Sequence, residues 1–172
     1  MGRILVTRLA TVLLLLALAN CGFQPLYGAR GGDRATAPTA EMAAVSIGQI
    51  FDRPGQLLRN ALLDRLNPTG EPSRPRWRLD LSLTEARSDT VILRDSTATF
   101  AKYSVDARWV LVDLTTQAPI TRGRARRTTS FSIVSSEFAT LEAERDAQRR
   151  AMTEIAEDIR LRLGLFFQRS DG

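Results

Sequence analysis

Three stretches in which apolar and polar residues alternate constrain the fold of this chain most strongly. Alternation with a period of two is typical of a β-strand that has one buried face and one solvent-exposed face. The clearest case is 77–84, and the pattern returns over 97–114 and 120–135. Only a short turn separates the last two stretches, as expected for neighbouring antiparallel strands. The pattern therefore predicts a mainly antiparallel sheet with one polar face.

Two helices are predicted, one before these strands and one after them. The first begins at Asp52-Arg53-Pro54, because aspartate can cap a helix and proline is tolerated in the first turn. It ends at Asn67-Pro68-Thr69-Gly70. The second runs from 136 to about 163. Its apolar stripe, which we expect to pack on the sheet, consists of Phe138, Leu141, Met152, Ile155, Ala156, Ile159, Leu163 and Phe166.

The order of the predicted elements defines a fold class. A strand within 42–51 precedes the first helix, so the chain reads β-α-β-β-β-α. This order predicts an α+β fold, a two-layer sandwich in which a roughly four-stranded, mainly antiparallel sheet carries both helices on one face. The stretch 85–96 fits either a strand or a loop, because charged residues flank Val91-Ile92-Leu93 on both sides.

The N-terminus has the features of a bacterial export signal. Arg3 and Arg8 accompany an apolar run of about 11 residues, whereas a membrane-spanning helix needs about 20. The run ends in Leu18-Ala19-Asn20-Cys21, which resembles the lipobox of bacterial lipoproteins. In that family the signal peptide is cut before the cysteine, which is then acylated. We therefore predict lipid attachment at Cys21, where a thiolate would be the nucleophile.

These features predict the domain organisation. Residues 1–20 are the expected signal peptide. Residues 21–41 are the lipidated N-terminus and a flexible tether, since 28–41 is small, polar and without periodicity. Residues 42–172 are expected to form a single α+β domain.

The composition excludes several chemistries. The chain has no histidine and one cysteine, which removes the commonest general base and the usual nitrogen and sulfur metal ligands. No P-loop or nucleophile elbow is present in the sequence. The acids Glu154, Glu157 and Asp158 are interspersed with arginines, as on a solvated helix face. We therefore expect no enzyme, no cofactor and no metal site.

Basic side chains gather on the polar face of the last two predicted strands. Alternation places Arg122, Arg124 and Arg126 side by side and turns Arg127 to the other face. A row of like charges is costly unless counter-charges or an anionic partner neutralise it. The candidate anion contacts are Arg122, Arg124, Arg126 and, if the neighbouring strand aligns, Lys102 and Arg108. The alternatives are a solvated or protein-interface face balanced by Asp80, Asp106 and Asp113, or a different register.

The residues Cys21-Gly22-Phe23-Gln24-Pro25-Leu26-Tyr27 resemble the mature N-terminus of the LptE family of lipopolysaccharide-assembly lipoproteins. Lipoproteins retained in the inner membrane tend to carry aspartate after the cysteine, so Gly22 implies a lipid anchor in the outer membrane, facing the periplasm. The resemblance further implies a domain that lies partly inside the lumen of the LptD β-barrel, plugs that barrel and assists its assembly. It also implies a part in the transport and insertion of lipopolysaccharide, for which the five basic residues are candidate contacts.

Two other functions remain to be compared with this one. A lipid-anchored periplasmic binding module or enzyme, unrelated to lipopolysaccharide, predicts a deep pocket with perturbed acids. A nucleic-acid-binding sheet would need pairs of exposed aromatic side chains on the arginine face, where the sequence places no such pair. Export also argues against nucleic acid, so no nucleic-acid partner is expected.

Overall fold

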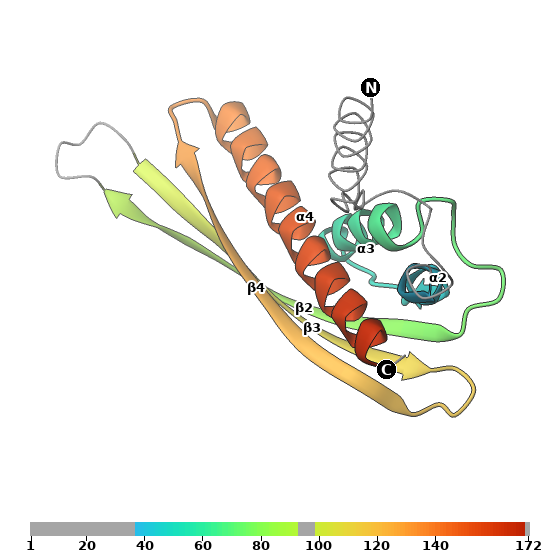
Figure 1. Ribbon diagram of the computed structural model, residues 1–172. Helices are drawn as coiled ribbons and strands as arrows, with labels where there is room; N and C mark the ends of the chain where they lie inside the picture. Colours follow the sequence, from blue (N-terminus) through green and yellow to red (C-terminus); the bar gives the residue numbers. More distant parts are fainter. Residues whose placement is uncertain (1–36, 93–98, 171–172) are drawn as a thin grey trace, which may run out of the picture. The chain divides into compact units, whose positions relative to one another are not determined.

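The computed structural model describes residues 37–92 and 99–170 (Figure 1). The predicted signal peptide, Cys21, the predicted tether up to residue 36 and residues 93–98 lie outside the described residues. The elements in chain order are α2 (Ala37–Ala43), β1 (Val45–Ile47), α3 (Arg53–Leu66), β2 (Trp77–Ile92), β3 (Thr99–Asp113), β4 (Pro119–Ile133) and α4 (Glu137–Ser170).

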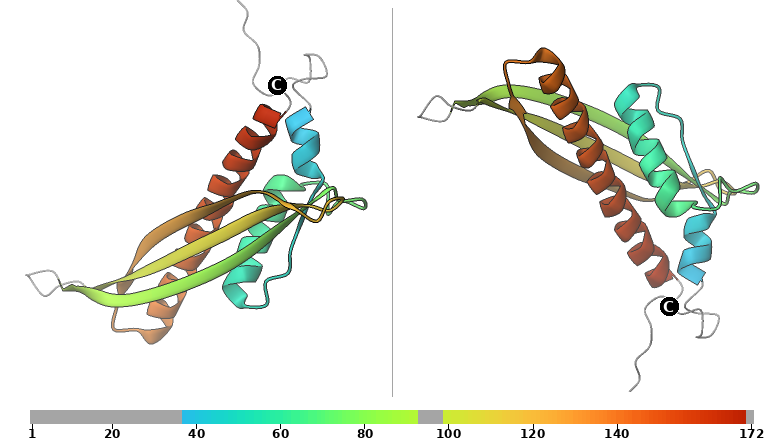
Figure 2. Two further views of the ribbon diagram at one scale, coloured as in Figure 1. Left: turned by 90° about the horizontal axis from the view of Figure 1, so that it is seen from below. Right: turned by 90° about the horizontal axis from the view of Figure 1, so that it is seen from above.

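The strands form one sheet in the order β1-β2-β3-β4. β1 pairs with β2 in parallel, and the two remaining pairs are antiparallel. α3 and α4 lie on the same face of this sheet (Figure 2). The predicted α+β sandwich is therefore confirmed, with one additional short helix, α2, packed against α4.

The N-terminal edge of the fold differs from the prediction. The strand expected within 42–51 is reduced to Val45–Ile47, and residues 37–41, expected to be tether, are helical. The sequence of α2, APTAEMA, is rich in good helix formers, and its proline stands near the helix start, where its missing N–H costs nothing. Packing against α4 then stabilises a helix that is too short to be stable alone.

α3 begins and ends as predicted. Asp52 caps the helix, and its Oδ1 accepts a hydrogen bond of 2.6 Å from the Gly55 backbone N–H. At the other end, the buried Asn67 side chain donates a hydrogen bond of 2.9 Å to the Ala43 carbonyl, which ties α3 to the end of α2. Leu58, Leu62 and Leu66 lie on one side of α3 and are buried.

Loss of the α3 cap gives a first testable expectation. Asp52→Ala removes the acceptor for the Gly55 N–H, so we expect the free energy of unfolding to fall by about 1 kcal/mol. Urea unfolding of the mature chain measures this change. Asp52→Ser keeps a capping oxygen and should cost clearly less; equal losses for the two variants would contradict the capping role.

β2 resolves the ambiguous stretch of the sequence. The strand continues from Trp77 to Ile92, so residues 85–92 belong to the sheet, with a register irregularity between Asp89 and Val91. Residues 93–96 of the same stretch lie outside the described part.

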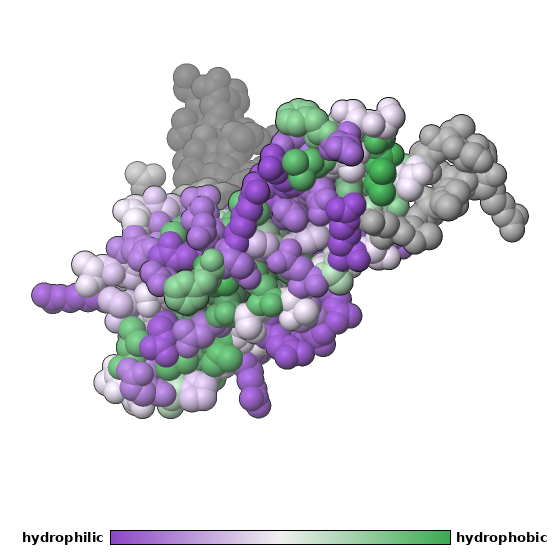
Figure 3. Space-filling view, turned by 180° about the vertical axis from the view of Figure 1, so that it is seen from behind, coloured by the Kyte–Doolittle hydropathy of each residue, from purple (hydrophilic) through white to green (hydrophobic). Residues whose placement is uncertain are grey.

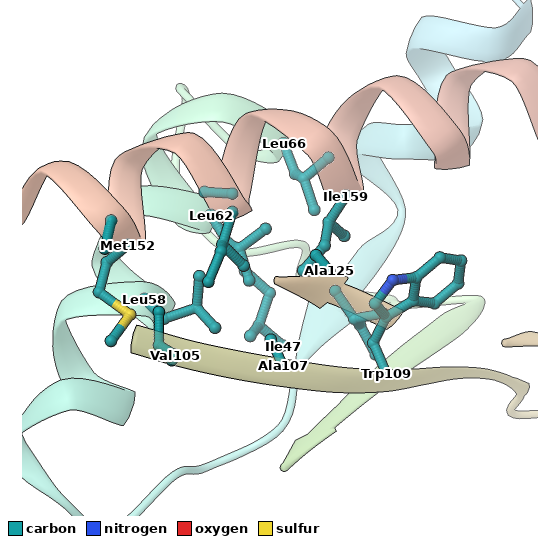
Figure 4. Close-up of a cluster of buried hydrophobic side chains, with 14 of the residues drawn as sticks. Ile47, Leu58, Leu62, Leu66, Val105, Ala107, Trp109, Ala125, Met152 and Ile159 are labelled. Atoms are coloured by element: carbon teal, nitrogen blue, oxygen red, sulfur yellow. The ribbon is translucent and has the colours of Figure 1, made fainter. Parts of the chain in front are cut away.

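The core fills the space between the sheet and the two long helices. Side chains from α3, α4 and β3 point toward one another there (Figure 4). Two members of the predicted α4 stripe are not part of it, since Phe138 is 73% exposed and Leu141 44% exposed. The buried residues of α4 begin only at Ala147. α4 crosses the sheet obliquely, and its first turns lie near the end of β4 rather than over the sheet centre (Figure 1).

Candidate functional site

The polar face of β3 and β4 carries the five predicted anion contacts, all of them exposed. In the register of the two strands, Arg108 lies directly opposite Arg124 and Asp106 directly opposite Arg126. The intervening residues Ala107 and Ala125 are buried on the other side of the sheet. The predicted facing of both strands is therefore confirmed for Lys102, Arg108, Arg122, Arg124 and Arg126.

Asp106 is the centre of this face. Arg124 donates from its Nε to both carboxylate oxygens of Asp106 at 2.7 Å, and Arg126 Nε donates to Oδ2 at 2.9 Å. The side chain of Asp106 is only 13% exposed between them. The hydrogen bond from Arg124, reinforced by Arg126, lowers the pKa of Asp106 to about 2, although partial desolvation opposes the shift. One carboxylate thus holds two guanidinium groups in fixed positions.

The remaining cations of this face have no such partner. Within the described residues, Lys102, Arg108 and Arg122 form no ion pair with any acidic side chain. Arg108 instead faces Arg124 across the strand pair, and like charges directly opposite one another destabilise a sheet. The unpaired N–H groups of Arg108 and Arg122 are therefore available to an external anion.

Two of the three predicted counter-charges are engaged elsewhere. Asp80 accepts a hydrogen bond of 2.9 Å from Arg78 on its own strand. Asp113 accepts hydrogen bonds from the backbone N–H groups of Thr115 and Thr116, which lower the pKa of Asp113 and fix the β3–β4 turn. Among the described residues, only Asp106 pairs with arginines of this face, so the acids are not spread evenly over it.

Lys102 lies apart from the other four. It stands opposite Ser130, four residues from Asp106 along β3, which corresponds to about 13 Å in a strand. The structure thus brings together an arginine cluster, which we define as Arg108, Arg122, Arg124 and Arg126. Planar guanidinium forks bind phosphate and carboxylate oxygens bidentately, so this cluster has the chemistry of an anion-binding surface.

The opposite face of the sheet carries a polar network that the sequence analysis did not predict. The buried Tyr103 hydroxyl donates a hydrogen bond of 2.5 Å to Glu85, and burial together with that carboxylate raises the pKa of Tyr103. Arg87 Nη1 donates to Glu144 of α4 at 2.6 Å. The signal was present in the sequence, since alternation places Glu85 and Arg87 on the core side of β2. The Tyr103–Glu85 hydrogen bond joins β3 to β2, and the Arg87–Glu144 contact joins α4 to the sheet.

The acidic side chains Glu154, Glu157 and Asp158 of α4 form ion pairs with arginines, as expected for a solvent-exposed helix face. Arg160 bonds Glu157 and Arg162 bonds Asp158 within α4, while Arg127 reaches Glu154 across the β4–α4 interface at 3.3 Å. In the part of the chain that the structure describes, no group of three or more acidic, histidine or cysteine side chains could hold a metal ion.

The described helices do not include one long and apolar enough to cross a membrane. Seen from behind, the molecule shows hydrophobic residues in small groups among hydrophilic ones (Figure 3). Most large apolar side chains lie in the core, whereas Phe51, Val134, Phe138, Leu141, Leu161 and Leu165 are exposed.

Comparison with known proteins identifies the family. The family model of LptE, described as lipopolysaccharide-assembly, matches residues 42–163. A protein of Caulobacter crescentus CB15 described as a lipoprotein has a similar structure, with 25% identity, a TM-score of 0.62, and coverage of 78% of this chain and 97% of that one. No curated protein matches the sequence.

Two further solved structures share the fold at lower identity. The minor lipoprotein of Acinetobacter baumannii is 14% identical, with a TM-score of 0.55 and coverage of 70% of this chain and 88% of that one. Rare lipoprotein B of Shewanella oneidensis is 11% identical, with a TM-score of 0.54 and coverage of 74% and 97%. Since the family model matches well over half of the chain, this protein belongs to the LptE lipopolysaccharide-assembly family.

Proposed function

We propose that this protein is an outer-membrane lipoprotein, acylated at Cys21, that plugs the LptD β-barrel and assists its assembly. In this role it takes part in the transport and insertion of lipopolysaccharide, and no catalytic step is assigned to it. It faces the periplasm and lies partly in the barrel lumen. The proposed lipopolysaccharide contacts are Arg122, Arg124, Arg126 and Arg108, with a more distant contribution from Lys102.

The observation that carries the lipopolysaccharide contact is the charge imbalance of the arginine cluster. Arg108 faces Arg124 without an intervening acid, and Asp106 is the single carboxylate among these cations. Lipopolysaccharide carries phosphates and carboxylates on lipid A and its inner core. An anion bound across Arg108 and Arg122 would relieve the repulsion, and family membership makes lipopolysaccharide the anion to test.

The layered architecture of the fold supports the proposed partnership with the barrel. The helices cover one face of the sheet, and the other face is polar. The lumen of a transmembrane barrel is also polar, so a polar sheet face that packs against it meets polar groups on the other side.

The arginine cluster is tested by a double substitution. Arg108→Gln with Arg122→Gln removes the two unpaired guanidinium groups, and we expect the mature chain to bind purified lipopolysaccharide about tenfold more weakly. The loss should shrink as salt is added, because exposed charges are screened. Fluorescence titration with labelled lipopolysaccharide measures both effects.

The matched control is Arg149→Gln with Arg162→Gln on α4. These two substitutions change the net charge by the same amount as the first pair, but Arg149 and Arg162 are paired with Asp146 and Asp158. Equal losses of binding in the two double variants would show a general charge effect and would refute the assigned contact.

The partner and the anchor are tested together in the cell. Tagged mature protein purified from outer membranes should bring down LptD in near-stoichiometric amount, and its N-terminal peptide should carry acyl chains on Cys21. An acylated protein without LptD would refute the plug role. An unmodified Cys21 would refute the anchor.

A further inference from the structure

A shallow cavity lies at the start of α3. Its volume is about 410 Å³, and it is lined by Gln49, Ile50, Phe51, Gln56, Arg59 and Asn60. α3 covers the face of the sheet opposite to the arginine cluster. The cavity is therefore separate from the proposed lipopolysaccharide contacts.

The walls of this cavity are held in place by the cap of α3. Gly55 is buried, and a Cβ atom at this position would lie 2.0 Å from Ile50 Cγ2, so the loop packs directly on the helix backbone. The hydrogen bond from Gly55 N–H to Asp52 fixes the same turn. A ligand that enters here meets a preformed surface and does not have to order a loop.

The polar groups of the cavity converge without satisfying one another. Gln56, Arg59 and Asn60 are spaced i, i+3 and i+4, which puts them on one side of α3, facing Gln49 of the loop. Within the described residues, the three side-chain amides form no hydrogen bond. Arg59 pairs with Glu71, so the amides are the polar groups of this cavity that are left for a ligand. The cavity thus offers both donors and acceptors.

Phe51 gives the cavity an aromatic wall. It is 90% exposed, more than any other large apolar side chain in the described part of the chain. The loop does not need this ring for packing, because Ile50 makes the contact with Gly55. An exposed aromatic ring beside free amide groups matches a ligand that has both an apolar face and polar edges.

We propose that this cavity binds a neutral sugar ring. The ring of Phe51 stacks on the apolar C–H face of the sugar. The amides of Gln49, Gln56 and Asn60 exchange hydrogen bonds with its hydroxyl groups, since each amide both donates and accepts. Among the described residues, no carboxylate lines the cavity, so the proposed role is binding of the sugar and not its hydrolysis.

Side-chain amide resonances test this proposal directly. The ¹⁵N-labelled mature chain is titrated with glucose, galactose and N-acetylglucosamine. We expect at least one sugar to shift the side-chain amide signals of Gln49, Gln56 and Asn60 together and saturably, with a Kd of about 1–10 mM, while Gln168 on α4 does not move. Absence of shifts at these three amides for all three sugars at about 50 mM would overturn the proposal.

Two substitutions assign the contacts. Phe51→Ala and Gln56→Ala should each weaken binding of the responsive sugar about tenfold. Phe138→Ala, which removes an exposed ring near the start of α4 that does not line the cavity, should leave binding unchanged. Both cavity residues are exposed, so an unchanged urea midpoint is expected and shows that the fold is intact.

The remaining outcomes separate this proposal from the previous ones. The Arg108→Gln, Arg122→Gln variant should bind the sugar as the unsubstituted chain does, even if it no longer binds lipopolysaccharide. If no sugar moves the amides and Phe51→Ala lowers the recovery of LptD, the surface is a protein contact and the sugar site is refuted.

Discussion

Replacing Gly123 by alanine is expected to lower the free energy of unfolding by about 2 kcal/mol. A Cβ atom at this position would lie 2.4 Å from Cζ2 and 2.6 Å from Cε2 of Trp109. Trp109 is only 3% exposed, so its ring cannot swing into solvent and must displace its core neighbours. Urea unfolding followed by tryptophan fluorescence measures the loss.

Gly164→Ala provides a control of opposite sign. A Cβ at this position in α4 would meet only Met42 Sδ at 3.7 Å, an ordinary contact. Alanine should therefore stabilise the helix by about 0.5–1 kcal/mol. A loss of stability at position 164 as large as that at position 123 would mean that the backbone, and not contact with Trp109, governs the effect.

The central strands could be predicted from sequence because burial on one face imposes a strict period of two. A slip of one residue would expose Trp109 and Leu111 and bury Arg108, so a single facing is stable. For the same reason the face of Arg122, Arg124 and Arg126 followed from the sequence. Local pattern and tertiary burial agree there.

The edges of the domain were harder to predict because tertiary contacts decide them. β1 has three residues, too few for an alternation signal, and α2 depends on α4 for its packing. The apolar stripe predicted for α4 extends further toward the N-terminus than the buried face of the helix does. Phe138 and Leu141 have helical spacing, but spacing alone does not show where the helix leaves the sheet.

The charge pairs of the candidate site were also hard to predict from the sequence. Alternation placed Asp80, Asp106 and the arginines on one face, but which acid meets which arginine depends on the strand register. The register puts Asp106 opposite Arg126, and Asp80 opposite the apolar Val110, where it bonds Arg78 instead. Asp106 was therefore predicted only as one of three counter-charges and not as the residue that organises the cluster.

Substitution of Asp106 separates a structural role from a binding role. It is expected to lower the stability of the fold but to raise the affinity for lipopolysaccharide. Asp106→Asn keeps the size of the side chain but removes its charge, so the hydrogen bonds from Arg124 and Arg126 weaken. We expect the free energy of unfolding at pH 7 to fall by about 1.5 kcal/mol, less than a fully buried pair would lose, since both arginines are more than half exposed.

The pH dependence of this loss follows from the lowered pKa of Asp106. A carboxyl whose pKa falls from 3.8 to about 2 on folding stabilises the native state above pH 3.8, and this stabilisation is lost as the pH falls toward 2. The difference between the unsubstituted chain and Asp106→Asn should therefore be constant above about pH 4 and shrink below it. A difference that persists unchanged at pH 2 would exclude the ion pairs as its cause.

The same substitution is expected to strengthen lipopolysaccharide binding severalfold at low salt, because it removes the carboxylate that neutralises Arg124 and Arg126. Asp158→Asn on α4 is the matched control: its side chain is similarly covered at 18% exposure and is likewise paired with an arginine. It should lower stability without raising affinity. If Asp106→Asn also leaves the affinity unchanged, the arginines act as a solvated face held by one carboxylate, and lipopolysaccharide must bind elsewhere on the protein.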